Sequence, residues 1–364
     1  MNTELDAKLS QIQALLSERA LDALLVQTVA NFAWVTGGAA SYVNIAQDLG
    51  LASLLITPTG RYLITNNIEA PRLRREEALE EQGWEFEIFP WYGAVDPIAH
   101  LTRGLRLGTD GHYPGAQDLS AELIRLRADL LPTEQKRFRE VCQGCAQAMR
   151  ATVDGLKPGM SEYEIAAILG EQAQRRELLP IVNLIATDER VYAFRHPLPT
   201  AKKLERYAML VLCGRKYGLV ASITRLVHFG AMPADLRRKA EAVAQIDAAF
   251  IAATRPGRTL GEIFQIAQSE YARLGYPAEW QLHHQGGLAG YRSREAVAVP
   301  GSDLMVKTGQ VYAWNPSITG TKSEDSILVK TDGADILTEI PGWPAISIDV
   351  NRQRIPRPAI LEII

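Results

Sequence analysis

The chain has 364 residues, a formal net charge of −3, and 47% apolar and 22% charged side chains. This composition excludes a disordered chain, and the absence of excess positive charge argues against a nucleic-acid partner. The sequence has no run of about 18 apolar residues and no basic start followed by an apolar stretch. We therefore expect a cytoplasmic protein without a membrane span, and the length favours two domains.

The first third of the sequence alternates between helical and strand patterns. Apolar residues at helical spacing predict helices over residues 5–18, 70–81 and 119–130. Short apolar runs bounded by turn residues predict strands over residues 21–27, 51–57, 62–65, 85–90 and 105–109. This alternation predicts an α/β domain over residues 1–130.

A second domain is expected from Pro132 onward, where Thr133 is suited to cap a helix. Long helical patterns over residues 135–156 and 233–254 are each followed by Pro-Gly and a capping box, the first at Ser161 and the second at Thr259. Strand-like runs follow both copies. The repeat predicts a pseudo-symmetric α+β domain over residues 131–364, with two helix pairs covering one curved antiparallel sheet.

The stretch VYAWNPSITGTKSEDSILV, residues 311–329, predicts a hairpin with Asn315 and Glu324 near the facing ends of its two strands. Burying the adjacent carboxylates of Glu324 and Asp325 is costly unless they meet cations or donors. They therefore mark either a functional site or a solvated strand end. Cys142 and Cys145 lie in a helical pattern without a second Cys or His pair at zinc spacing, so we interpret them as buried thiols.

Three histidines lie in places suited to catalysis. His196 stands in a proline-stiffened loop, where an imidazole can transfer protons near neutral pH, although a surface histidine is the simpler alternative. His283 and His284 precede two glycines that would let a ligand approach the backbone. Because neighbours on a strand point to opposite faces, we expect at most one of the two to face a given pocket. Arg294 is suited to bind a carboxylate, or else belongs to a solvated basic stretch.

The order of these motifs resembles the creatinase and Xaa-Pro aminopeptidase family of pita-bread hydrolases. The resemblance covers nearly the whole chain, through the elements NFAWVTGG, LKPGMSEYEIA, HHQGGL and NPS…KSEDSILV. It implies a creatinase-like α/β N-terminal domain over residues 1–130 and an α+β pita-bread domain over residues 131–364. The internal repeat agrees with the pseudo-twofold symmetry of this fold.

The resemblance also implies positions for the two metal ions that peptidases of this family hold with two Asp, one His and two Glu. These positions fall on Val211 (give or take one residue), Ser222, His284, Asn315 and Glu324. Three carboxylates are thus replaced by residues that bind metal poorly or not at all. We therefore expect no metal and no other cofactor, while a single weakly held ion near His284 and Glu324 stays open.

Creatinase itself is a metal-free member of the family, and resemblance to it implies proton transfer by His196 and carboxylate binding by Arg294. Its two acidic contacts to a guanidinium group would fall on Thr224 and Asn315, which are neutral here. Creatine is therefore a poor candidate substrate.

The sequence thus predicts a metal-independent hydrolase that cleaves a C–N bond of a small carboxylate-bearing compound. We assign catalysis to His196, His284 and Glu324. We assign substrate binding to Arg294, Asn315, Ser222, Thr224, Tyr42 and Asn44. The alternatives are a non-catalytic ligand-binding protein of the same fold and a metal-dependent Xaa-Pro aminopeptidase or dipeptidase. The resemblance further implies a homodimer in which residues 41–45 of one chain lie near the site of the other.

Overall fold

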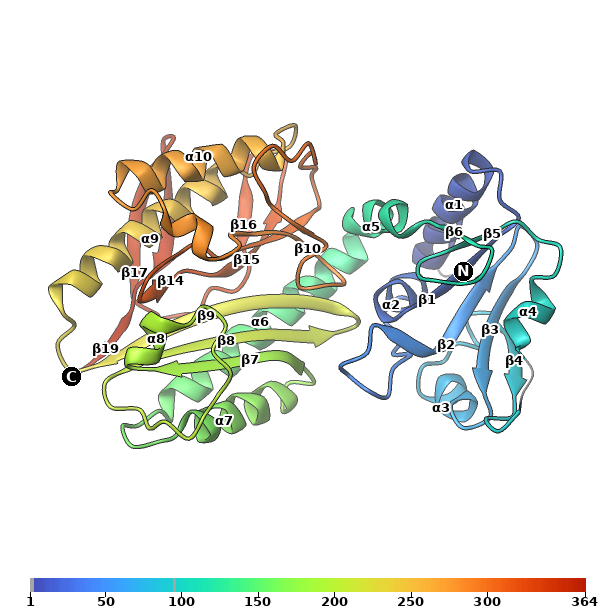
Figure 1. The fold of residues 1–364 in the computed structure, drawn as a ribbon, viewed down its shortest axis with the longest axis horizontal. Coiled ribbons are helices and arrows are strands. Elements are labelled where there is room, and N and C mark those ends of the chain that lie inside the picture. The colour runs from blue at the N-terminus through green and yellow to red at the C-terminus, as the bar shows by residue number, and fades with distance from the viewer. Residues whose placement is uncertain (1–2, 94–95) are drawn as a thin grey trace. The chain divides into compact units, whose positions relative to one another are not determined.

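The computed structural model describes residues 3–93 and 96–364. It forms two compact units, Met1–Arg127 and Ala128–Ile364 (Figure 1). Within the described residues, no helix is both long and apolar enough to cross a membrane.

The first unit is built on a six-stranded sheet with the strand order β4-β3-β2-β1-β5-β6. Its strands are β1 (Ala23–Thr28), β2 (Leu49–Ile56), β3 (Arg61–Asn66), β4 (Glu85–Phe89), β5 (Leu107–Thr109) and β6 (Gln117–Asp118). Its helices are α1 (Thr3–Glu18), α2 (Val29–Thr36), α3 (Ala70–Arg75), α4 (Pro97–Leu101) and α5 (Ser120–Ala128). The predicted α/β class is confirmed. The helix predicted over residues 70–81 is too long, because Ala78 adopts a positive φ of 51° that a right-handed helix does not allow.

Two sheets and four long helices form the second unit (Figure 1). One sheet has the order β19-β9-β8-β7 and the other the order β11-β10-β12-β15-β16. The main helices are α6 (Pro132–Asp154), α7 (Glu162–Gln174), α9 (Ala234–Ala253) and α10 (Leu260–Arg273). The strands of the first sheet are β7 (Leu179–Thr187), β8 (Tyr207–Lys216), β9 (Leu219–Phe229) and β19 (Leu361–Ile363). The strands of the second are β10 (Gly286–Ala289), β11 (Ala296–Val297), β12 (Val311–Trp314), β15 (Asp325–Val329) and β16 (Ala334–Ile336).

Short elements complete the second unit. They are α8 (Glu189–Ala193), the 3₁₀-helix η1 (Glu279–Leu282), β13 (Ser317–Ile318), β14 (Thr321–Lys322), β17 (Ala345–Val350) and β18 (Gln353–Pro358). Helices α6 and α7 pack on the sheet of β7, β8 and β9, while α10 packs on α9. This arrangement is the predicted pita-bread fold.

The prediction of one continuous antiparallel sheet needs correction. The two sheets are separate ladders that meet at an isolated bridge between Thr224 and Glu324, and β19 runs parallel to β9. The serine hydroxyl of Ser326 strengthens the junction, because it accepts from the backbone N–H of Ser222 and donates to its carbonyl. The junction therefore places residues of β9 beside the start of β15.

Two of the three predicted helix caps in this unit are present. Ser161 and Thr259 both form capping boxes, as the repeat predicts. Thr133, however, does not cap α6. The cap is Leu131, because Pro132 fits the first helical position and Glu134 accepts the backbone N–H of Leu131.

The cysteines are buried free thiols, as predicted. Burial raises the pKa of Cys145 to about 12 and raises that of Cys142 well above its ordinary value. Both thiols are therefore protonated and unreactive at neutral pH.

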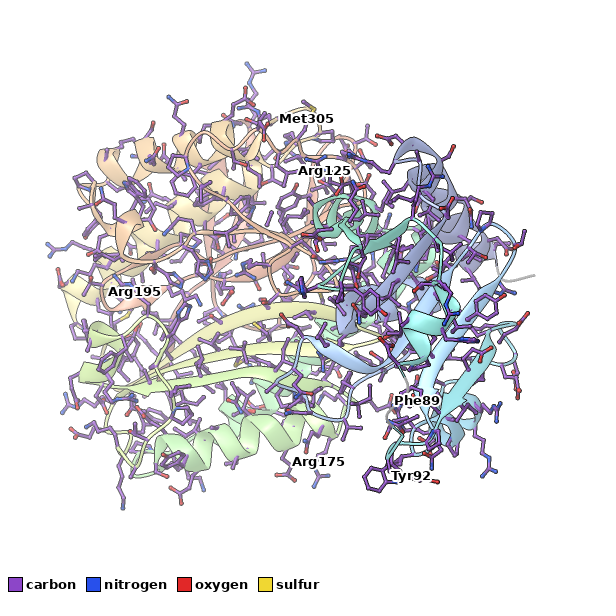
Figure 2. All side chains as sticks on the ribbon, turned by 45° about the vertical axis from the view of Figure 1, so that its right-hand side comes forward. Phe89, Tyr92, Arg125, Arg175, Arg195 and Met305 are labelled. Carbon is purple, nitrogen blue, oxygen red and sulfur yellow. The ribbon has the colours of Figure 1, made fainter. Side chains whose placement is uncertain are left out.

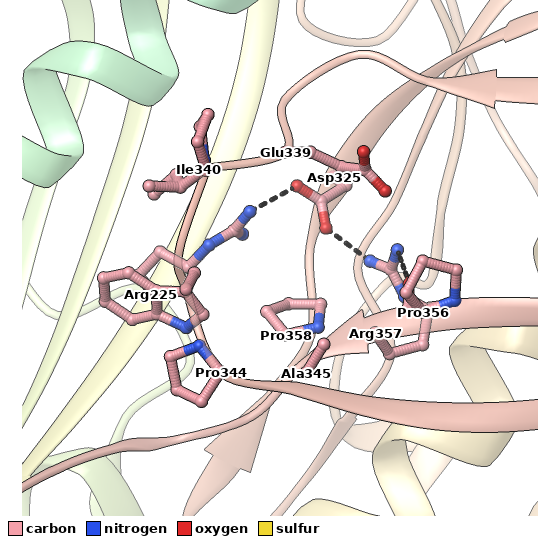
Figure 3. A pocket seen from close by; sticks show the side chains of 11 residues that line it. Arg225, Asp325, Glu339, Ile340, Pro344, Ala345, Pro356, Arg357 and Pro358 are labelled. Carbon is pink, nitrogen blue, oxygen red and sulfur yellow. Dashed lines mark hydrogen bonds and ion pairs between the residues drawn. The ribbon is translucent and has the colours of Figure 1, made fainter.

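A buried ion network fixes strand β15 from the side opposite Glu324. Asp325 binds Arg225 at 2.8 Å and Arg357 at 2.5 Å (Figure 3). Arg357 also binds Asp247 at 2.7 Å. All four side chains are at least 98% buried. The network borders a small cavity of about 170 Å³, whose lining includes Arg225, Asp325 and Arg357 together with four prolines and Trp343.

The substitution Asp325→Asn tests how much this network stabilises the second unit. It removes the only carboxylate that pairs with Arg225 among the described residues, whereas Arg357 keeps Asp247, and an unpaired buried charge costs about 3–5 kcal/mol. Chemical denaturation should show a loss of that size. Arg354→Ala is the control, because the Arg354–Asp349 pair on the neighbouring hairpin is more than 70% exposed and should contribute at most about 1 kcal/mol. Equal losses in the two variants would contradict the account.

Candidate functional site

The hairpin of β12 and β15 forms the floor of the candidate site. Trp314 pairs with Asp325, so Asn315 and Glu324 lie at the facing strand ends, as predicted. Both are 2% exposed, which rules out the alternative of a solvated strand end. Residues between them form a second short ladder of β13 and β14, in which Lys322 lies two positions before Glu324. Two positions on an extended chain share a face, so both side chains reach the same side.

Glu324 is held by two cations and a hydroxyl. Lys322 Nζ lies 2.8 Å from Oε2, Arg294 Nη2 lies 2.9 Å from Oε1, and Thr224 Oγ1 donates to Oε2 at 2.6 Å. Burial alone would raise the pKa of Glu324, but the charges of Lys322 and Arg294 outweigh burial and hold the pKa far below its ordinary value. Glu324 is therefore ionised and its oxygens are engaged.

Ser222 and Thr224 on β9 line the same side of the junction. Ser222 Oγ lies 3.2 Å from Arg294 Nη1 and 3.3 Å from Cys213 Sγ. Cys213 pairs with Ser222 across β8 and β9, and Val211 pairs with Thr224. The structure thus brings together four predicted residues, namely Ser222, Thr224, Arg294 and Glu324.

Strand β10 lies in the chain between the adjacent histidines and Arg294. The glycines Gly286 and Gly287 serve the neighbouring strands rather than a ligand. A Cβ at Gly286 would lie 2.1 Å from the carbonyl oxygen of Ala313, and one at Gly287 would lie 2.2 Å from that of Ala296. Their φ angles of 102° and 151° also favour glycine. The prediction that these glycines let a ligand approach the backbone is therefore corrected, because it is the neighbouring strands that approach them closely.

Both adjacent histidines join His196 in one cluster, contrary to the prediction that at most one would face a given pocket. His283 Nε2 lies 3.1 Å from His196 Nε2, and the rings of His283 and His284 are centred 4.6 Å apart. One ring nitrogen of each residue lies within 4.8 Å of the others. The prediction fails because His283 and His284 lie in the connection between η1 and β10, where strand alternation does not apply.

Two ion pairs hold the loop of His196 in place. Arg195, labelled in Figure 2, binds Glu279 of η1 at 2.7 Å and thereby ties this loop to the segment that carries His283. The other anchor is Glu162 of α7, which is fully buried. Its carboxylate accepts from Arg190, from the backbone and hydroxyl of Thr187, and from those of Thr200. Both ends of the loop are therefore fixed to one carboxylate.

The three imidazoles are neutral at neutral pH. Burial, followed by the charge of Lys322, lowers the pKa of His283 to about 2. Burial, followed by the charge of Arg294, lowers the pKa of His284 to about 4. Burial also lowers the pKa of the more exposed His196. Each ring therefore keeps one nitrogen lone pair available.

Comparison with known proteins identifies the chain. Residues 136–333 match the model of metallopeptidase family M24, and residues 8–141 match the creatinase/prolidase N-terminal domain. The chain belongs to metallopeptidase family M24. The predicted creatinase and Xaa-Pro aminopeptidase resemblance is thereby confirmed.

Relatives of this M24 chain include Xaa-Pro dipeptidases and a protein with a different name. It is 27% identical over 314 residues to the "Agropine synthesis cyclase" of Rhizobium rhizogenes, covering 73% of this chain and 78% of that protein. It is 24% identical to the Xaa-Pro dipeptidase of Lactobacillus helveticus over 74% of this chain and 82% of that protein. The prolidase structure of Pyrococcus horikoshii matches with a TM-score of 0.80 and 21% identity, covering 92% and 98% of the two chains.

Lys322 and His283 belong to this site but are not among the predicted site residues. The position of Lys322, two residues before Glu324, is the signal that both side chains share a face. His283 is missed because strand alternation assigns it to the face opposite that of His284. Tyr42 and Asn44 lie in the first unit, between α2 and β2, so their part in substrate binding stays a prediction.

Glu162→Gln tests the anchor of the His196 loop. Burial would raise the pKa of Glu162, but hydrogen bonds from Arg190, Thr200 and Thr187 outweigh it and lower the pKa. A lowered pKa stabilises the folded state when the pH is above the ordinary pKa of 4.5. This stabilisation is lost as the pH falls from 4.5 through the pKa of the folded state. The free energy of unfolding of the variant should be about 1–3 kcal/mol lower than that of the wild type at pH 7. This difference should become smaller at pH 4 and below.

Glu171→Gln on the same helix is the control for this measurement, because its pair with Arg175 is more than half exposed. Thermal unfolding as a function of pH measures both variants. A stability gap for Glu162→Gln that stays constant from pH 7 to pH 3 would contradict the anchoring role.

Proposed function

We propose that this M24 protein is a hydrolase that cleaves a C–N bond of a small carboxylate-bearing compound without the metal pair of the family's peptidases. The observation that carries the proposal is the pairing of Glu324 with both Lys322 and Arg294. Fixed cations thus lie where the resemblance implies metal ions. Membership in a family of hydrolases supports the general reaction, and the site chemistry supports the finer assignment.

The charge of the site favours an anionic substrate. Lys322 and Arg294 carry two positive charges and Glu324 carries one negative charge, so these three groups leave one positive charge in a buried setting. Arg294 Nε is buried and, among the described residues, has no hydrogen-bond partner. A substrate carboxylate would satisfy this donor and offset the charge.

Three other polar atoms of the candidate site also lack hydrogen-bond partners. Asn315 Oδ1, His283 Nδ1 and His284 Nδ1 are buried and lack hydrogen-bond partners within the described part of the chain. Buried polar atoms are usually paired, so their concentration here favours a site that a ligand completes. A ligand with donors for these atoms and a carboxylate for Arg294 fits this inventory.

In the proposed reaction, a water oxygen attacks the carbon of the C–N bond while His196 accepts the water proton. The C–N bond then breaks, and His196 returns the proton to the leaving nitrogen. His196 suits this role because its pKa lies below its ordinary value, so the ring is neutral and able to accept a proton at neutral pH. His284 and Glu324 orient the water or substrate, and Ser222, Thr224 and Asn315 line the pocket.

The residues at the family's ligand positions do not suit two divalent ions. Val211 has no donor atom, Ser222 and Asn315 are neutral, and only Glu324 supplies a negative charge. Two ions within about 4 Å need several carboxylates to offset their repulsion. Lys322 and Arg294 add further repulsion, so we derive no step through such a pair.

Ring closure is a second candidate, favoured by the relative named "Agropine synthesis cyclase". The two reactions are separated by product mass, because hydrolysis adds one water to the substrate and ring closure does not. Small molecules that co-purify with the protein, identified by mass spectrometry, supply the substrates to test. A ligand that raises the melting temperature but is never converted would instead favour the non-catalytic binding protein.

His196→Ala should lower turnover about 10²- to 10⁴-fold, the range expected for loss of a proton-transferring group. Stability should change by less than about 1 kcal/mol because His196 is exposed. Steady-state kinetics and thermal unfolding give the two readings. His100→Ala, also exposed but in the first unit, is the control and should behave as the wild type. Full turnover in His196→Ala would assign proton transfer to another group.

We also propose that the protein is a homodimer in which residues 41–45, including Tyr42 and Asn44, approach the site of the partner. The exposed apolar side chains of Val43 and Ile45, at 63% and 49% exposure, support a contact at this segment. Light scattering at micromolar concentration should give twice the mass of the chain. A monomer would contradict the dimer, and Val43→Asp should weaken it.

A further inference from the structure

The cluster of His196, His283 and His284 has a property that the proposed hydrolysis does not use. Three neutral imidazoles converge, with one ring nitrogen from each within 4.8 Å of the others. Only His284 stands at a family metal position, since His283 replaces a glycine of the Gly-His-x-x-Gly-Leu element and His196 is the loop histidine. The cluster is therefore a different donor set from that of the peptidases.

We propose that His196, His283 and His284 together bind one divalent transition-metal ion of the zinc class through ring nitrogens. Three imidazoles with an open fourth position are a common zinc donor set. Ligand nitrogens on one tetrahedral zinc lie about 3.3 Å apart, since each Zn–N bond is about 2.0–2.1 Å. The 3.1 Å between the Nε2 atoms of His196 and His283 is close to this spacing.

Contacts from neighbouring side chains hold the segments of His283 and His196 in place. Gln285 Nε2 donates to the carbonyl of His283 at 2.5 Å, and Tyr271 Oη donates to Gln285 Oε1 at 2.7 Å. Arg195 fixes the His196 loop through Glu279. The Nδ1 atom of His284 is buried without a hydrogen-bond partner among the described residues, so it is free to ligate. The donors are thus arranged before an ion arrives.

The donor atoms, and not the nearby charges, set the class of ion. Lys322 and Arg294 oppose a dication and Glu324 attracts it, so electrostatics alone do not favour binding. Imidazole donors suit zinc, cobalt, nickel and copper, whereas magnesium and calcium require oxygen ligands. Selectivity for the first group follows from the donor type.

Metal binding would also inhibit the enzyme, a consequence that rests on the proposed function. An ion on His196 Nε2 takes the lone pair that accepts the water proton in the proposed reaction. Zinc should therefore lower turnover, and a chelator should restore it.

The site is tested by titrating chelator-treated full-length protein with Co²⁺ and recording visible absorption. We expect bands of low-coordinate cobalt that saturate at one ion per chain and vanish when Zn²⁺ displaces it. Loss of groups that only orient a ligand weakens metal affinity 10–100-fold, so loss of a ligand itself should cost at least about 100-fold. His283→Gln and His196→Gln should both show this loss, and the exposed His196 makes the second variant safe for folding.

His112→Gln is the control, because this histidine is exposed and lies in the first unit. Absence of cobalt bands at millimolar Co²⁺, or unchanged affinity in both ligand variants, would overturn the site. These readings need no substrate, so they stand even if the proposed hydrolysis fails. If the bands appear and zinc leaves turnover unchanged, the inhibitory consequence is wrong.

Discussion

The pairing of Glu324 with Lys322 and Arg294 is the interaction on which the site depends. A carboxylate that is 2% exposed is tolerated only because two cations and the Thr224 hydroxyl meet its oxygens. These partners come from β9, from β14 and from the segment between β10 and β11. One carboxylate therefore joins the two sheets of the second unit at the point where the candidate site lies.

The alternation of side chains along β14 and β15 separates this site from the structural core. Lys322 and Glu324 face the site, whereas Ser323 and Asp325 face Asp247 and Arg357. Each face has its own set of paired charges, so a change on one face need not unbalance the other. The adjacent acidic residues thus have different roles, which a count of charges along the sequence does not reveal.

Much of the fold could be predicted because its signals are local. Capping boxes, helical spacing and the hairpin of residues 311–329 each depend on residues close in the sequence, and the family resemblance supplied the architecture. The failures occurred where long-range packing decides the outcome. The three histidines lie together because Arg195 binds Glu279 and so ties the loop of His196 to the segment of His283. Gly286 is required because a Cβ there would clash with the carbonyl oxygen of Ala313 in a neighbouring strand. Neither contact has a signal in the local sequence.

The central claim is that fixed cations replace the family's metal pair. Its most direct test is elemental analysis of dialysed protein combined with turnover measured in the presence of a chelator, using the substrate identified by co-purification. The account predicts that turnover persists when the chelator has removed all divalent metal, because Lys322 and Arg294 are part of the chain. About two Mn, Co or Zn ions per chain, together with loss of turnover in the chelator, would contradict it.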